Sequence, residues 1–319
     1  FFVRYEQEAV QINIEPTERG VSYPDSFYWQ RFGTSAKTKN PYFMKNLNTR
    51  QTLGAYFSNV GMVYYQNQKP ERAVFYLGLS TAINPQSIDA QNNLANIYSE
   101  LKKPQEAIKH YKLALKADPA NTSTLFNLGL VLLGSGQATQ AFNTFLQITQ
   151  MDPGFKPAHK MLINMYMLNN RLIPVLLHLK ILARIEPMNL QNHLNVAVAY
   201  RKLGQHKLAI ETLKNVQSQF PDTPEIHEGL ADMYFEMEDF QHAIVQYRLV
   251  IDQDETRLTS YIQLGWIYYR LHDLPMAEAW TLRGLKKGKE VGQLKAMAQM
   301  NLGFYSLLQK KIQPGKRMV

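Results

Sequence analysis

Three histidines recur at a fixed spacing of 34 residues, at His159, His193 and His227. Imidazole nitrogens are common zinc ligands, so this column raises the possibility of a metal site. Zinc requires each nitrogen within about 2 Å, whereas successive packed helices lie about 8–10 Å apart. We therefore expect the histidines to pack inside the fold, and we predict no metal and no other cofactor.

Catalytic and membrane signals are also missing from most of the chain. The 319 residues contain no cysteine, which excludes disulfides, thiolate metal sites and a Cys nucleophile within them. Residues 54–319 contain no Walker loop, no HExxH and no GxSxG. The longest apolar run, 172–183, is short and carries His178 and Lys180, so we expect a soluble chain with no membrane span.

The net charge of +9 is concentrated at the C-terminal end. Residues 283–319 hold nine Lys and Arg and one acid, Glu290, which leaves residues 1–282 nearly neutral. A nucleic-acid interface needs a basic face together with base-stacking aromatics or a known module. We interpret the basic end as a solvated helix surface and expect no nucleic-acid partner.

An internal repeat of 34 residues is the strongest signal in the sequence. Each period holds a small residue, an aromatic three residues later, a second small residue and a closing proline. A small residue lets a neighbouring helix approach closely, and the proline stops the second helix. The first small column is Gly61, Ala95, Gly129, Ile163, Ala197, Ala231 and Gly265, and the closing prolines are Pro85, Pro119, Pro153, Pro187 and Pro221.

This pattern resembles the tetratricopeptide repeat family. The resemblance implies an all-α, right-handed α-solenoid of about seven helix-turn-helix repeats plus a capping helix. Unit 156–189 is the most divergent, because Ile163 and Val175 replace small residues, so we expect its packing to be looser or its helices to be shifted. The array spans 51–319, with units at 54–87, 88–121, 122–155, 156–189, 190–223, 224–257 and 258–291 and a cap at 296–309.

In this family the first helices line a concave groove, so the resemblance implies a protein or peptide ligand bound there. Positions 2, 5, 9 and 12 of each unit should face the groove, with apolar patches in the third and seventh units and an acidic patch in the sixth. The candidate groove residues are Asn92, Asn96, Phe126, Leu130, Lys160, Asn164, Asn195, Arg201, Trp266 and Tyr269, and Ile262 falls at the same positions.

Lys160, Asn164 and Asn195 also resemble the first part of the carboxylate clamp in chaperone-tail-binding repeats. Such a clamp holds the terminal carboxylate of a peptide with a Lys charge and Asn amides. The following unit has Glu225 and Gly229 where further basic residues should stand, and Asn recurs at this position along the array. We interpret the three residues as part of the repeat pattern, with a working clamp as the alternative.

The first 50 residues have a different character. Val10, Ile12 and Ile14 alternate with polar residues, which is typical of a strand. Together with the preceding segment they predict a hairpin with its turn near Gln7, so that paired positions sum to about 15. Glu15 then lies at the open end of this hairpin.

The stretch FFVRYE…INIEPT resembles the end of a transglutaminase-like, papain-related domain. The resemblance implies that Glu15 is the acid of a Cys-His-acid triad whose Cys and His lie upstream of this sequence. It also favours a bacterial cell-envelope location and makes residues 1–50 a domain remnant and connector. The alternative is an extended N-terminal arm packed on the first repeat. Two functions stay open: an interaction scaffold, and the C-terminal part of a transglutaminase-like or cysteine-peptidase-like enzyme. The oligomeric state is not predicted.

Overall fold

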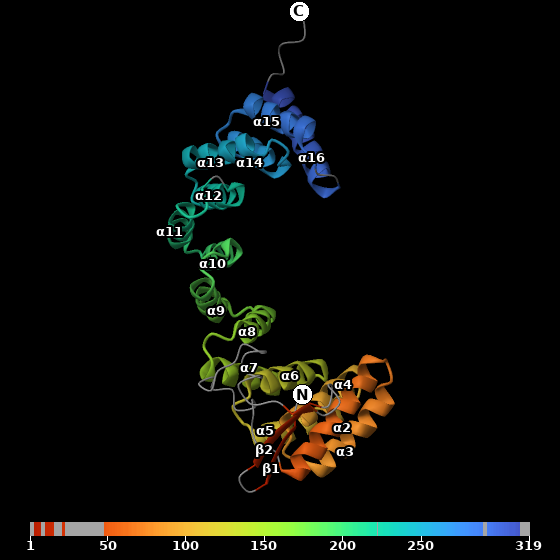
Figure 1. Ribbon diagram of the computed structural model, residues 1–319. Helices are drawn as coiled ribbons and strands as arrows, with labels where there is room; N and C mark the ends of the chain where they lie inside the picture. The colour runs from red at the N-terminus through yellow and green to blue at the C-terminus, as the bar shows by residue number, and fades with distance from the viewer. Residues whose placement is uncertain are drawn as a thin grey trace, which may run out of the picture. The chain divides into compact units, whose positions relative to one another are not determined.

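The computed structural model describes the backbone of residues 3–7, 10–15 and 21–22, and residues 48–221, 223–289 and 292–312. These residues contain a small sheet and fifteen helices, in the order shown in Figure 1. The chain divides into two compact units, residues 1–158 and 159–319, which are described separately. The helices are α2 (Thr49–Gln66), α3 (Pro70–Ile83), α4 (Ile88–Glu100), α5 (Pro104–Ala117), α6 (Thr122–Gly134), α7 (Ala138–Met151), α8 (Lys156–Leu168), α9 (Leu172–Ile185), α10 (Leu190–Lys202), α11 (His206–Gln217), α12 (Pro224–Glu236), α13 (Phe240–Gln253), α14 (Leu258–Arg270), α15 (Leu274–Lys287) and α16 (Gln293–Ile312).

Helix starts recur every 34 residues, which confirms the predicted α-solenoid of helix pairs. The even-numbered first helices from α4 to α14 begin at 88, 122, 156, 190, 224 and 258. Prolines stand at the start of the second helices α3 and α5, where the missing amide hydrogen is not needed. The helices of the divergent unit, α8 and α9, keep this period and are not shifted.

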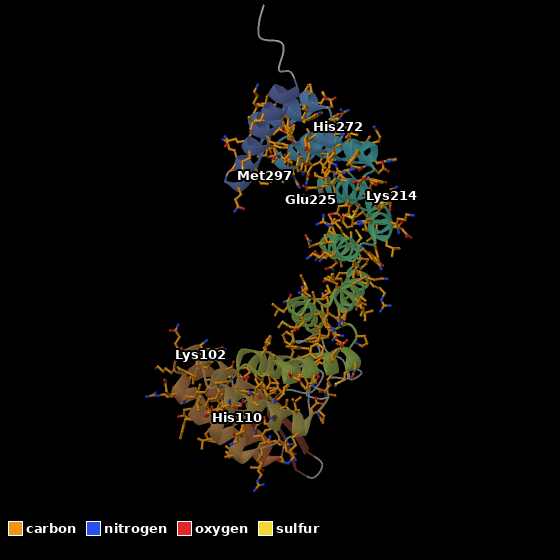
Figure 2. All side chains as sticks on the ribbon, turned by 180° about the vertical axis from the view of Figure 1, so that it is seen from behind. Lys102, His110, Lys214, Glu225, His272 and Met297 are labelled. Carbon is orange, nitrogen blue, oxygen red and sulfur yellow. The ribbon has the colours of Figure 1, made fainter. Side chains whose placement is uncertain are left out.

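The turn inside each helix pair contains one residue in the left-handed conformation. These residues stand 34 apart, at Gln68, Lys102, Gly136, Asn170, Gly204, Glu238 and His272, with φ between 52° and 80°. The next amide donates back to the carbonyl of the column aromatic, as Lys103 does to Tyr98 at 2.9 Å. This is a Schellman-type helix end, which normally favours glycine. Lys102 and His272 mark two of the turns in Figure 2.

The small-residue columns set the distance between the two helices of a pair. A Cβ added at Gly61 would lie 2.7 Å from Leu77 on α3, and one at Gly129 would lie 2.6 Å from Phe145 on α7. Both distances are below normal contact, so these positions exclude a side chain. In the divergent unit, Ile163 and Val175 are buried together with Leu179, so the core there is built from larger residues.

The N-terminal strands form an antiparallel sheet in the order β1 (Val3–Gln7), β2 (Val10–Glu15) and β3 (Val21–Ser22). Val3 pairs with Ile14 and Gln7 pairs with Val10, so paired positions sum to 17. The predicted register was therefore wrong by two residues, because β1 includes Gln7, on which the turn was centred. A shift of two preserves the face of each side chain, since strand side chains alternate with period 2. Residues 16–20 and 23–47, with the Pro-Thr of the triad motif, lie outside the described residues.

Candidate protein-binding surface on the first helices

Side chains at positions 2, 5, 9 and 12 of the first helices define what we call the first-helix surface. In residues 48–158 its polar members bond to the neighbouring repeat. Asn92 and Thr124 exchange hydrogen bonds of 2.8 and 3.0 Å. Asn96 accepts a 3.5 Å bond from Asn127 on the next first helix and a 2.5 Å bond from Tyr111 of its own repeat. Asn92 and Asn96 therefore hold adjacent repeats together.

Arg201, in the compact unit of residues 159–319, also pairs with the neighbouring repeat. Its Nη1 lies 2.7 Å from Oδ2 of Asp232 on the next first helix. The hydroxyl of Tyr247 donates to the other oxygen of Asp232 at 2.6 Å. Burial raises the pKa of Tyr247, and the negative charge of Asp232 adds to the shift, so the phenol stays protonated and the carboxylate stays its acceptor.

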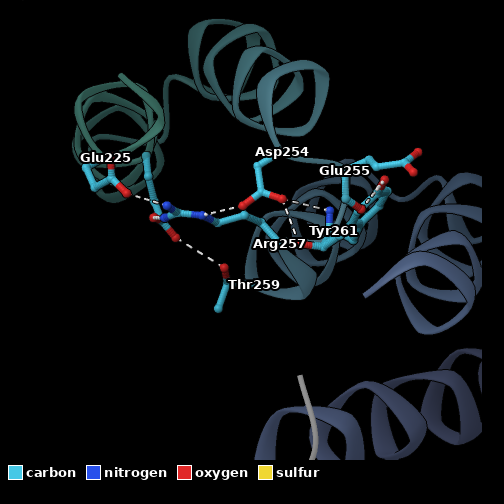
Figure 3. Close-up of polar contacts among 8 residues, drawn as sticks. Glu225, Asp254, Glu255, Arg257, Thr259 and Tyr261 are labelled. Carbon is cyan, nitrogen blue, oxygen red and sulfur yellow. Dashed lines mark hydrogen bonds and ion pairs between the residues drawn. The ribbon is translucent and has the colours of Figure 1, made fainter. Parts of the chain in front are cut away.

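Arg257, the residue just before α14, contacts three carboxylates of the sixth unit (Figure 3). Its guanidinium contacts Glu225 and lies 2.9 Å from Glu228, both on α12. Its Nε lies 3.2 Å from Asp254 in the loop before α14. Hydrogen bonds from Arg257 hold the pKa of Glu225 below its usual range, so this carboxylate is ionised at neutral pH.

The predicted acidic patch of the sixth unit is thus largely neutralised, because Arg257 and Arg201 occupy it. The bridging partners stand 29 to 32 residues apart, about one repeat. A search of the sequence for opposite charges at that spacing would have found these pairs.

The three clamp-like residues do not form a common binding site in the described contacts. Lys160 and Asn164 are exposed on α8, while Asn195 on α10 accepts a 3.0 Å bond from Gln191. An open depression of about 780 Å³ lies near α10 and is lined by eight residues. Its charged members are Glu186 and Glu225, and its lining residues include no Lys or Arg that could hold a peptide carboxylate.

The three histidines of the 34-residue column each have a different partner. His159 is buried with Nδ1 2.9 Å from Nδ1 of His178 on α9, a residue that the spacing pattern had not singled out. His193 lies 2.9 Å from the carbonyl of Pro187, and His227 lies 2.7 Å from Gln246. Among the described residues, no group of three His, Cys, Asp or Glu is arranged to hold a metal ion.

Aromatic side chains cluster where α14 meets α16, and we call Trp266, Tyr269 and Phe304 the aromatic patch. The Trp266 and Tyr269 rings stack with centroids 5.1 Å apart, and Phe304 meets Tyr269 edge-on at 5.3 Å. Trp266 keeps 39% of its surface exposed and Phe304 keeps 41%. Phe304 was missed by the sequence analysis, although it occupies position 9 of the incomplete eighth unit.

The other apolar candidates are placed differently. Leu130 is exposed on α6, whereas Phe126 is half-buried against Phe145 and Phe155. Ile262 is 2% exposed, so its assignment to the groove was wrong: Leu258 and Ala298 cover it. Position 5 of the seventh unit serves the contact with the next helix.

Comparisons with known proteins agree with this architecture. Two models of the tetratricopeptide repeat family match, at residues 88–121 and 192–223. The C-terminal part of a TPR repeat-containing protein from Cytophaga hutchinsonii is 14% identical, with 75% of this chain and 98% of that chain covered and a TM-score of 0.57. A chain of the Naa15/Naa10 complex bound to HypK-THB is 14% identical, with 82% of this chain and 42% of that chain covered and a TM-score of 0.59. No curated protein matched the sequence.

These likenesses show the fold alone, because the identities are low. The chain carries tetratricopeptide repeats, and this supports its interpretation as a protein-interaction scaffold. The described helices include none with the length and apolar character to span a bilayer.

Proposed function

We propose that the protein is a scaffold that binds a protein or peptide partner through the aromatic patch of α14 and α16. The observation that carries this proposal is the stacked, exposed pair of Trp266 and Tyr269 beside Phe304. Large aromatics have high contact area and few rotatable bonds, and they dominate measured binding hot spots.

The charge distribution supports an apolar anchor. Arg201 is paired with Asp232, and Glu225 and Glu228 are paired with Arg257, so binding a charged ligand there would first have to break those pairs. Breaking such a pair leaves a partly buried charge without its partner, which is costly. The aromatic patch carries no such cost.

Site-specific photo-crosslinking tests the proposal. A photoreactive phenylalanine analogue would replace Trp266 in one variant and Leu282, which is exposed on α15, in a control variant. With cell extract from the source organism, we expect a crosslinked protein at position 266 that is absent at position 282. Equal crosslinking at both positions, or none at 266, would refute the assignment.

A second candidate function concerns the sheet. β2 is its central strand and ends at Glu15, which pairs with Val21 of β3. This placement at a strand end is the position that the transglutaminase-like resemblance assigns to a triad acid, and an envelope location is proposed with it. Since these 319 residues contain no cysteine, the candidate requires a Cys and a His encoded upstream. An upstream reading frame without them would eliminate it. If they are encoded, loss of activity in Glu15→Gln of that longer protein is expected.

A further inference from the structure

The last helix presents an apolar face that no described helix covers. Met297, Met300, Phe304 and Leu307 are spaced by three, four and three residues, so they form one stripe along α16. All four are exposed, Met300 by 74% and Leu307 by 66%. The opposite side of α16 is anchored on the array through the fully buried Ala298 and Tyr305. We call the four residues the α16 face.

The repeat pattern shows what covers this face elsewhere. Position 5 of the seventh unit is Ile262, which is buried under Ala298 of the next first helix. Met300 stands 38 residues later at the same position of the eighth unit, and its side chain is exposed to solvent. The α16 face therefore continues the contact that α14 makes with α16, and a further helix would extend it.

The place that a second helix of the eighth unit would take is also open among the described residues. A Cβ at Gly265 would collide with Thr281 on α15, the second helix of that unit, whereas a Cβ at the equivalent Gly303 would meet nothing within 4 Å. In the described residues α16 has α14 and α15 as its neighbours, and Met297 lies near its start (Figure 2).

The charge of α16 and its flanking residues indicates which kind of partner could bind the α16 face. α16 contains Lys295, Lys310 and Lys311 and no Asp or Glu, within a segment of nine basic residues and one acid from 283 to 319. A second copy docked on this face would bring two basic segments of like charge together, which is unfavourable. An acidic helix would instead gain attraction from this basic segment.

We propose that the α16 face binds an acidic amphipathic helix of a partner protein, which takes the place of the next first helix in the array. The proposal rests on the proposed function, because Phe304 belongs to both surfaces, and it adds the chemical class of the partner. Apolar side chains of the partner helix pack on Met300 and Leu307, and its glutamates are attracted by the net positive charge of the segment.

A designed peptide pair tests this in the full chain. The probe is a fluorescent amphipathic peptide of about 20 residues, long enough to span α16, with leucines on one face and glutamates beside them. The matched peptide has every glutamate replaced by lysine. We expect the glutamate peptide to bind at least about tenfold more tightly, to gain helicity on binding and to weaken with added salt.

Variants locate the binding. Met300→Glu and Leu307→Glu should each weaken the glutamate peptide by at least about tenfold, whereas Leu282→Glu on α15 should leave it unchanged. Equal binding of the two peptides, or no effect of the α16 variants, overturns the proposal. Self-association of the chain that Met300→Glu abolishes would assign the face to a second copy and overturn it also. Binding of anionic vesicles in place of the peptide would assign it to a lipid surface. If a partner crosslinks at position 266 but the glutamate peptide does not bind, the proposed function stands and only this inference is rejected.

Discussion

The indole of Trp266 stacks on the phenol ring of Tyr269 with an angle of 19° between the ring planes. The two residues stand three apart on α14, so both rings project from one helix face. Tyr269 also stacks on Tyr305, whose side chain is fully buried. The exposed indole is therefore held in place by the core of the array before any partner arrives.

Replacing Gly129 by Ala should destabilise the compact unit of residues 1–158. The added methyl would lie 2.6 Å from Phe145, which is itself fully buried. We expect a loss of about 1–3 kcal/mol in the free energy of unfolding, measured by urea denaturation. Gly134→Ala is the control on the same helix, because its Cβ would meet nothing within 4 Å. The control should be neutral or slightly stabilising. Equal losses in both variants would contradict the close-packing role of Gly129.

Replacing Lys102 by Gly should stabilise the chain. Lys102 has φ of 59°, and a non-glycine residue in this conformation is strained by about 1 kcal/mol. Gly136→Ala at the equivalent turn should lower the free energy of unfolding by a similar amount. Thermal unfolding followed by circular dichroism would show opposite shifts in Tm. A loss of stability in Lys102→Gly would mean that its side chain makes contacts that outweigh the strain.

The ion pairs of Arg257 with Glu225, Glu228 and Asp254 should make the free energy of unfolding depend on pH. The folded-state pKa of Glu225 is lowered by its hydrogen bonds to Arg257, so the stabilisation is present above the ordinary pKa and is lost as pH falls through the lowered value. Arg257→Met should lower the free energy of unfolding at neutral pH by about 1 kcal/mol, and the difference from wild type should shrink in acid. Lys202→Met, at an exposed cation on α10, should give no such pH-dependent difference.

The buried His178 should have an effect in mild acid. Burial, together with the neighbouring His159, lowers the pKa of His178 from 6.5 to about 4. Between these values the unfolded chain binds a proton that the folded chain does not, so stability falls as pH falls. We expect a loss of about 2 kcal/mol between pH 7 and pH 5, measured by urea denaturation.

His178→Phe should flatten that profile. His272→Asn, at an exposed turn residue with φ of 61° where asparagine is tolerated, should leave it unchanged. An identical pH profile in His178→Phe and wild type would show that another group is responsible.

The helix pairs could be predicted because their determinants are local. Small residues, aromatics and prolines at a fixed period specify where each helix starts, stops and meets its partner. The left-handed turn residues escaped prediction because Gln68, Lys102 and Glu238 are ordinary residue types, which the turn geometry forces into that conformation. The hairpin register was wrong because the sequence pattern did not specify the turn length.

The candidate site could be predicted only in part. Position within the repeat identified Trp266 and Tyr269, but it placed Ile262 on the same surface although that side chain is buried. Arg257 was missed because Glu225 and Glu228 stand 32 and 29 residues away and meet it only when the chain folds. Phe304 needed the recognition that an incomplete unit continues the same surface.

The most direct measurement is the affinity of the partner identified by crosslinking for wild type and for Trp266→Ala, obtained by equilibrium titration of the purified proteins. We predict that the variant binds at least about 30-fold more weakly, as expected for an aromatic hot spot of about 2 kcal/mol or more, while its thermal unfolding stays close to wild type. An affinity within about twofold of wild type would contradict the account, because the aromatic patch would then not be the surface that holds the partner.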